Sequence, residues 1–270
     1  MKKRGHMPQT DLPAWVDSLQ SKGLYFFTRK EAIDTLSVSE VALKQAATRL
    51  IKKNRIVRIL GGFYIIVPLE YLSTGMLPAE WFISDLMKYV EQPFYVGLLS
   101  AAFLHGAAHQ QPQQFQVVTT RPLREIKSKS LAIRFFVKKR FNNTRTVQIK
   151  TQTGFIPVST PEATALDLIR YARAIGGLDR VLTILQELGE TIQSPKLIEA
   201  VRADDNLAYA QRLGWLLERA GFPGTTGELA QWIHEKNPSP ARLEPSLPIR
   251  GSKKDTRWRL FLNSEVESDL

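Results

Sequence analysis

The sequence contains no cysteine, which excludes disulfide bonds, thiolate metal sites and cysteine nucleophiles. It also lacks a long apolar run: the longest, Phe94 to Ala108, is interrupted by Gly97 and His105 and is too short to span a bilayer. The opening residues, MKKRGHMPQTD, lead into further polar residues without the apolar core of a signal peptide. We therefore expect a cytoplasmic protein with no membrane partner.

Acidic residues are also few compared with basic ones. The 270 residues include 26 Asp and Glu and 37 Lys and Arg, which gives a net charge of +11. The excess lies in two stretches: residues 1–70 hold twelve basic and six acidic side chains, and residues 121–150 hold ten and one. Both stretches predict a polyanionic partner, although a basic surface can also serve solubility alone. The length suggests about two domains.

The first seventy residues contain the pattern of a helix-turn-helix. Thr28 and Glu31 have the spacing of a capping box and predict a helix over residues 29–36. After a three-residue turn, Ser39 can cap a second helix over residues 40–53. Two helices joined by so short a turn are typical of the helix-turn-helix motif.

A β-hairpin is expected directly after these helices. The runs Arg55–Leu60 and Phe63–Val67 are rich in β-branched and aromatic residues, and they flank Gly61-Gly62, which permits the positive φ angles of a tight turn. Helix, turn, helix and hairpin together predict a winged helix over residues 1–70. Domains of this kind bind DNA, and some bind protein instead.

The second predicted helix has an apolar and a polar side. Leu43, Ala46, Ala47 and Leu50 share one side, whereas the other offers an amide, a hydroxyl, a guanidinium and amines. Such groups read base edges and neutralise phosphates, although a solvated helix face is the alternative. The residues that we expect to contact DNA are Thr28, Arg29, Ser39, Val41, Lys44, Gln45, Thr48, Arg49, Lys52, Lys53, Arg55 and Arg58. Of these, Gln45, Thr48 and Arg49 would contact bases.

Strands followed by helices are expected in the remainder, which predicts an α+β domain over residues 71–235 with a helical C-terminal half. The strand-like runs are 115–119, 131–137, 146–149 and 155–158, and the helical runs are 78–89, 161–169, 178–188, 195–203 and 206–220. Residues 236–270 form a proline-rich, charged extension in which Trp258–Leu262 could dock as a strand. The predicted fold class is thus α+β, with an N-terminal winged helix followed by a mixed domain.

The second basic stretch could form a surface of its own. Strand alternation predicts Arg134, Phe136 and Lys138 on one face. Such a surface could follow a nucleic-acid backbone, or it could be a charged sheet edge that discourages aggregation. Its expected members are Arg121, Arg124, Lys127, Lys129, Arg134, Lys138, Lys139, Arg140 and Arg145.

No catalytic residue, metal or cofactor is expected, although two patterns in the sequence resemble parts of metal sites. Glu125-Ile126-Lys127, with Asp85 or Glu91 upstream, resembles the Glu-x-Lys end of a metal-dependent nuclease site. His105 and His109 have the i, i+4 spacing of metal ligands, but no third ligand is evident.

Other polar groups have simpler interpretations. Ser159 and Thr160 are expected to cap the helix from Pro161 rather than to form a triad with Asp167, since no histidine lies nearby in the sequence. Surface charges of a helix are expected at Arg212, Glu218 and Arg219.

Three segments resemble the AbiEi-type antitoxins. They are Gly-x-x-Ser-Ala-Ala-x-x-His-Gly at 97–106, Ile-Pro-Val-Ser-Thr-Pro-Glu-Ala-Thr-Ala-Leu-Asp-Leu at 156–168, and Gln-Arg-Leu-Gly-Trp-Leu-Leu-Glu at 211–218, where Trp215 replaces the family's usual Tyr. The resemblance covers roughly Leu24 to Phe222.

The resemblance implies an antitoxin of a bacterial toxin–antitoxin pair. Its winged helix would bind repeats in the promoter of its own operon and repress transcription. Its C-terminal domain would oppose a nucleotidyltransferase-like toxin, often without a stable complex. Gly97 is followed by Leu98 rather than by the Ser of a nucleotidyltransferase turn, so the toxin would be a separate protein. The alternatives are a protein-interaction module that binds the toxin directly and a metal-dependent nuclease.

Overall fold

The computed structural model describes residues 11–107, 112–128 and 130–268, and the chain divides into two compact units. The first comprises the residues up to Pro93 together with 123–135 and 149–156, and the second comprises 94–122, 136–148 and the residues from Pro157 onward. This division differs from the expected boundaries at residues 70 and 235, because the first unit runs further and takes in two later segments. Over the described ranges, no helix combines the length and the apolar character that crossing a bilayer requires.

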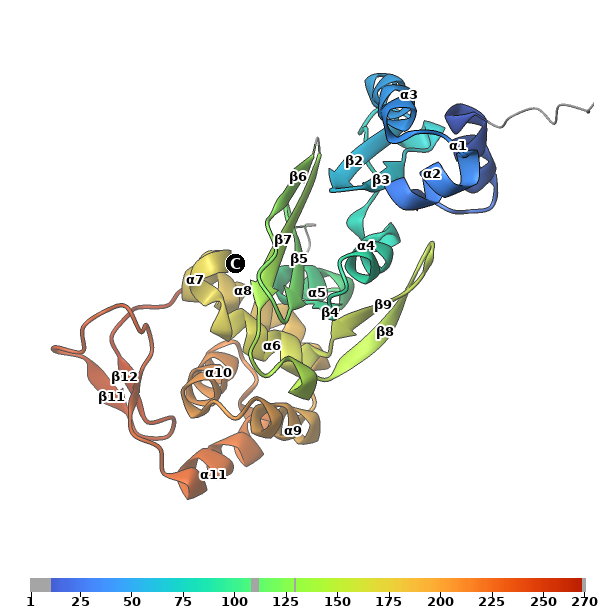
Figure 1. The fold of residues 1–270 in the computed structure, drawn as a ribbon. Coiled ribbons are helices and arrows are strands. Elements are labelled where there is room, and N and C mark those ends of the chain that lie inside the picture. The colour runs from blue at the N-terminus through green and yellow to red at the C-terminus, as the bar shows by residue number, and fades with distance from the viewer. Residues whose placement is uncertain (1–10, 108–111, 129, 269–270) are drawn as a thin grey trace, which may run out of the picture. The chain divides into compact units, whose positions relative to one another are not determined.

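The first unit begins with helices and a small antiparallel sheet (Figure 1). Up to Pro93, its α-helices and strands are α1 (Leu12–Ser21), β1 (Phe26–Thr28), α2 (Arg29–Leu36), α3 (Glu40–Lys52), β2 (Ile56–Leu60), β3 (Phe63–Ile66) and α4 (Ile83–Tyr89). The sheet order is β1-β3-β2. The helices expected over 29–36 and 40–53 are confirmed, the second ending one residue early. The helix expected over 78–89 is instead a 3-10 turn, Ala79–Trp81, followed by α4.

Apolar side chains from α1, α2, α3 and the sheet form one core in this unit. Val16 and Phe27 are almost fully buried, and the ring of Phe27 stacks on Tyr64 with centroids 5.0 Å apart. Fully burying a side chain of this size contributes roughly 1.5–3 kcal/mol. The core therefore fixes α3 against the sheet by one face only.

A mixed sheet carries most of the later strands. These are β4 (Phe94–Val96), β5 (Phe115–Thr119), β6 (Ile126–Ser128), β7 (Leu131–Val137), β8 (Thr146–Thr151) and β9 (Gly154–Ser159), in the order β6-β7-β5-β4-β9-β8. β4 pairs antiparallel with β5 and parallel with β9. The strands expected at 115–119 and 131–137 have the predicted bounds, and the two later strands are longer than predicted.

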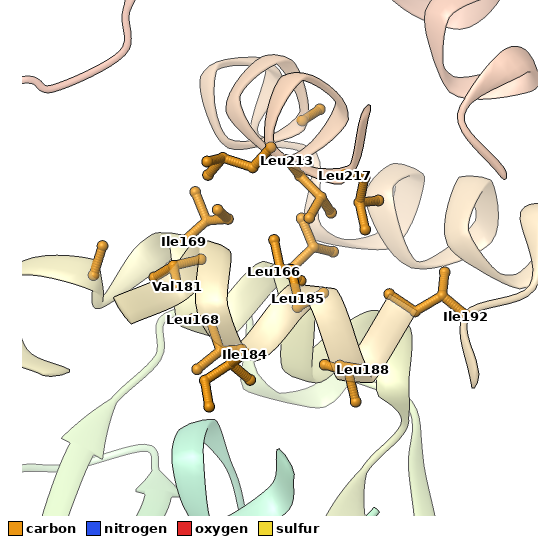
Figure 2. Close-up of a cluster of buried hydrophobic side chains, with 14 of the residues drawn as sticks. Leu166, Leu168, Ile169, Val181, Ile184, Leu185, Leu188, Ile192, Leu213 and Leu217 are labelled. Atoms are coloured by element: carbon orange, nitrogen blue, oxygen red, sulfur yellow. The ribbon is translucent and has the colours of Figure 1, made fainter. Parts of the chain in front are cut away.

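Helices fill the rest of the second unit, in agreement with the predicted α+β class. They are α5 (Leu98–Leu104), α6 (Pro161–Arg170), α7 (Ala172–Ile175), α8 (Gly177–Leu188), α9 (Ser194–Asp204), α10 (Leu207–Arg219) and α11 (Gly227–Lys236). Figure 2 shows apolar side chains of α6, α8 and α10 meeting in one core, among them Leu166, Leu185 and Leu213.

The C-terminal segment belongs to this same core. It forms β10 (Ala241–Arg242), β11 (Lys253–Asp255) and β12 (Leu260–Leu262), in the order β10-β12-β11. Leu243, Trp258 and Leu260 are fully buried, and Val266 is nearly so. The predicted docking strand is thus observed, although it begins at Leu260. Residues 241–266 are part of the folded unit rather than an appendage to it.

Candidate nucleic-acid interface

Helix α3 begins at a side-chain cap and buries one face. The hydroxyl of Ser39 accepts a hydrogen bond from the backbone N–H of Ala42 at 3.2 Å, which satisfies one of the free N–H groups at the start of the helix. Leu43, Ala47 and Leu50 are buried in the core of the unit. The remaining sides of α3 are left facing solvent.

The exposed side of α3 carries hydrogen-bond donors and cations. Val41, Lys44, Gln45, Thr48, Arg49 and Lys52 are all exposed. The Thr48 hydroxyl donates to the carbonyl of Lys44 at 2.8 Å, and its oxygen keeps the capacity to accept. Among the described residues, none forms an ion pair with Lys44, Arg49 or Lys52. These charges are therefore available to a partner.

Four of the predicted DNA-contacting residues instead have partners within the protein. Thr28 caps α2 in a capping box with Glu31, as predicted, and Ser39 caps α3. Arg29 pairs with Glu40 at 2.6 Å, and Arg55 pairs with Asp17 of α1. The sequence shows that these groups are polar, but the partners of Arg29 and Arg55 lie 11 and 38 positions away. Of the other predicted contacts, Lys53 and Arg58 are exposed.

The turn between β2 and β3 requires glycine at both positions for different reasons. Gly61 has a φ of 52°, in the left-handed region that favours glycine. Gly62 lies so close to α2 that a Cβ there would come within 2.8 Å of the Cβ of Arg29. The Gly62 N–H donates to the hydroxyl of Tyr89 at 3.2 Å, and its carbonyl accepts from the Arg29 N–H at 2.6 Å. The sequence predicted the turn but not this attachment.

A cleft of about 170 Å³ lies beside α3 and the hairpin. Lys44 of α3 and Arg58 of β2 both line it, together with Glu40, Leu43, Tyr64 and Arg29. Two cations that line one cleft can bind the same or adjacent phosphates. The structure thus brings together two of the residues predicted to contact DNA, which are 14 positions apart in the sequence.

The second basic stretch is divided between the two units. Arg124, Lys127 and Arg134 belong to the first, and Arg121 with residues 138–145 belongs to the second. Arg121, Arg124 and Lys139 are exposed, while Arg140 pairs with Asp205 at 2.7 Å and Arg145 with Glu199 at 2.8 Å. Lys129 lies outside the described residues. The stretch is therefore not one continuous, solvent-facing set of cations.

The prediction that Lys138 belongs to a basic surface is wrong, because its side chain is only 3% exposed. Along β7 the buried positions are Leu131 and Ile133 and then Phe136. Burial therefore moves from the odd-numbered to the even-numbered residues, and a strict alternation of buried and exposed side chains does not hold along the whole strand. The Lys138 ammonium lies 2.8 Å from Asp167 and 3.4 Å from Asp204. Arg170 contacts Asp204 at 2.6 and 2.7 Å, and the Tyr95 hydroxyl donates to Asp167 at 2.7 Å.

This cluster of two cations, two carboxylates and a phenol balances its own charge. Burial raises the pKa of Tyr95 well above its ordinary value, and the nearby Asp167 carboxylate adds to the effect. Burial alone would lower the pKa of Arg170, but Asp204 and Asp167 outweigh it and raise that pKa. Each carboxylate is already bonded to two groups of the cluster, so the arrangement holds the unit together rather than presenting a reactive group. The clue in the sequence was Asp167, a charge inside the apolar run Ala163–Ile169.

Ser159 and Thr160 differ in role. Thr160 caps α6 as predicted, accepting from the Ala163 N–H at 3.3 Å. Ser159 is not a cap: its hydroxyl lies 2.7 Å from that of Thr164. The His105 Nε2 lies 2.7 Å from the Ser159 carbonyl, and since a carbonyl can only accept, this nitrogen carries the proton. This hydrogen bond gives the half-buried His105 a structural contact.

The side chains of α10 hold the C-terminal segment. Arg212, predicted on the surface, is 7% exposed and donates to the carbonyls of Arg242 and Leu243 at 2.9 and 3.1 Å. A Cβ at Gly214 would overlap the ring of Trp258. The surface prediction is therefore wrong for Arg212, whereas Arg219 is exposed as predicted and Glu218 is half-buried. Glu218 accepts from Arg257 and from the indole of Trp258, and Arg219 donates to the carbonyl of Val266.

The nuclease and metal patterns gain no support from the geometry. Glu125 pairs with Lys127 itself at 3.0 Å, and burial raises the pKa of Asp85. In the described parts of the chain, no group of three or more His, Asp or Glu side chains is placed to hold a metal ion. His109 lies outside those parts.

Comparison with known proteins agrees with this architecture. The fold is similar to the crystal structure of the RV2827C protein from Mycobacterium tuberculosis, with a TM-score of 0.63 over 95% of this chain and 90% of that one. The two sequences are 14% identical, so the likeness concerns the fold alone. No curated protein shows significant sequence similarity to the chain.

Part of the chain can be assigned more closely. Residues 95–219 match the AbiEi antitoxin C-terminal domain. The resemblance to AbiEi-type antitoxins inferred from the three segments is therefore confirmed, and it supports an antitoxin role in a toxin–antitoxin system. The match ends at Arg219, the last of the α10 residues that hold the C-terminal segment.

Proposed function

We propose that the protein is an antitoxin that represses its own operon by binding DNA through a winged helix in its first unit. The observation that carries this proposal is the exposed side of α3, where Lys44, Arg49 and Lys52 have no ion-pair partner among the described residues. The element order from α1 to β3 and the glycine turn are those expected of a winged helix.

In the proposed complex, α3 enters a major groove. Gln45, Thr48 and Arg49 contact base edges, because their amide, hydroxyl and guanidinium can form paired hydrogen bonds there. Lys44, Lys52, Lys53 and Arg58 bind phosphates and set the register. Val41, 67% exposed on the same helix, can contact a thymine methyl group. The toxin opposed by the second unit is proposed to be nucleotidyltransferase-like.

A gel-shift titration against the protein's own upstream DNA and a scrambled duplex, at about 50 and about 200 mM salt, tests this function. We expect preference for the upstream DNA at both salt concentrations. Equal affinity for the two duplexes that disappears at the higher salt would overturn specific repression. Retention of a co-expressed toxin at high salt would then favour the rival function, a module that binds the toxin directly.

The assignment of base contacts is tested by Arg49→Ala. Because a base-contacting arginine contributes about 1–3 kcal/mol of discrimination, the preference for upstream DNA should fall by roughly 5- to 150-fold. Lys52→Ala is the matched control from the same helix, and it should weaken binding to both duplexes equally. An Arg49→Ala variant with unchanged preference would show that α3 does not read bases through this residue.

A further inference from the structure

The strands β6 and β7 place part of the second basic stretch in the first unit. Residues 123–135 belong to the same compact unit as α3. β6 lies beside β2, the strand that carries Arg58. The hydroxyl of Ser130 also donates to the carbonyl of Thr74 at 3.1 Å. These cations are therefore attached to the unit that carries the proposed DNA-reading helix.

The two faces of this strand pair differ in character. The register joins Ile126 to Ile133 and Ser128 to Leu131, and the three apolar residues of these pairs are buried. Lys127, paired with Ala132, points to the opposite face, and its side chain is 68% exposed. Arg124, just before β6, is also exposed. Glu125 contacts Lys127 at 3.0 Å and offsets only part of this charge.

Charge counts indicate which partner this face fits. Residues 11–93 hold ten basic and nine acidic side chains, whereas residues 123–135 hold four and one. The short hairpin thus adds more net positive charge to the unit than the 83 described residues before it. Proteins that bind single strands stack bases on aromatic rings, but the exposed positions of the hairpin, among the described residues, are Arg124, Glu125, Lys127 and Ser130, none of them aromatic. Cations without exposed rings complement the backbone of a duplex.

We propose that the β6–β7 hairpin is a second DNA contact, in which Arg124 and Lys127 bind phosphates beyond the base pairs that α3 reads. The contact rests on the proposed function, since it presumes that the first unit binds DNA. It reads no bases and so raises the affinity for every duplex alike. It also lengthens the protected stretch of backbone.

The test measures how salt weakens the binding of the full chain carrying R124Q/K127Q. Each phosphate contact contributes about 0.9 to the slope of log affinity against log salt, so the slope should fall by about 2. Affinity for upstream and scrambled DNA should decrease by the same factor. The matched control is K196Q/R250Q, which removes two exposed cations from the second unit and should leave the slope unchanged. Equal slopes for the two double variants would overturn the proposal.

Comparing the R124Q/K127Q variant with the Arg49→Ala variant separates the two proposals. If Arg49→Ala abolishes preference while R124Q/K127Q keeps the wild-type slope, the hairpin contact is refuted and base reading by α3 stands. If R124Q/K127Q lowers the slope but the wild type shows no preference for its upstream DNA, the hairpin contact stands and specific repression is refuted. Circular dichroism and thermal melting establish that both double variants are folded.

Discussion

The two units use their cations in opposite ways. On α3, Lys44, Arg49 and Lys52 face solvent without ion-pair partners among the described residues, whereas in the second unit Lys138 is 3% exposed between two carboxylates. An exposed lysine keeps its hydration, so its charge carries little free-energy cost, and it can replace bound water with a phosphate group. A buried lysine is tolerated only when other charges replace the lost solvent. The same residue type thus serves a partner in one unit and the fold in the other.

Replacing Lys138 should have the largest effect of the changes that test this comparison. Lys138→Met leaves Asp167 and Asp204 buried without their shared cation, and removing one partner of a buried pair costs about 3–5 kcal/mol. Lys44→Met on α3 is the control, and its free energy of unfolding should change by no more than about 0.5 kcal/mol. Urea denaturation of both variants measures the difference. Similar losses in the two would abolish the distinction between the units.

A smaller loss is expected for Arg212→Met. The guanidinium of Arg212 satisfies two carbonyls of the C-terminal segment, and leaving buried acceptors unpaired costs about 1–3 kcal/mol. The loss should be local, so the amides of residues 241–243 should exchange hydrogen faster than those of α8. Exchange that rises evenly across the unit would argue against a specific attachment of the segment by Arg212.

The pH dependence of stability gives the smallest effect. Burial raises the pKa of Tyr95 in the folded chain, whereas an unfolded tyrosine ionises near pH 10. The contribution of Tyr95 to the free energy of unfolding is therefore complete below about pH 10 and is lost as the pH rises further. Between pH 8 and pH 10.5 the wild type should lose about 1 kcal/mol more than Tyr95→Phe, as measured by urea denaturation. Parallel losses in both proteins would show that Tyr95 ionises equally in the folded and unfolded states.

Local chemistry made α2 and α3 predictable, because Thr28 and Ser39 cap helices through residues only three positions away. The exposure of Gln45, Thr48 and Arg49 followed from helical periodicity. Partners distant in the sequence could not be predicted in this way. Lys138 meets Asp167 29 positions later, and Arg212 meets residues about 30 positions away. A single sequence gives the charge of such residues without indicating whether they face water or each other.

The attachment of the C-terminal segment also has a consequence for synthesis on the ribosome. The ring of Trp258 lies against Gly214, and the backbone N–H of Glu267 donates to Asp179, 88 positions earlier. Contacts that close such long loops form late, because the loop must be ordered before they are made. The second unit can complete its core only when residues 258–267 have emerged. The core that holds α3 lacks this dependence, since the buried residues that form it all precede Val67. During translation, the helix proposed to bind DNA can therefore fold before the second unit is complete.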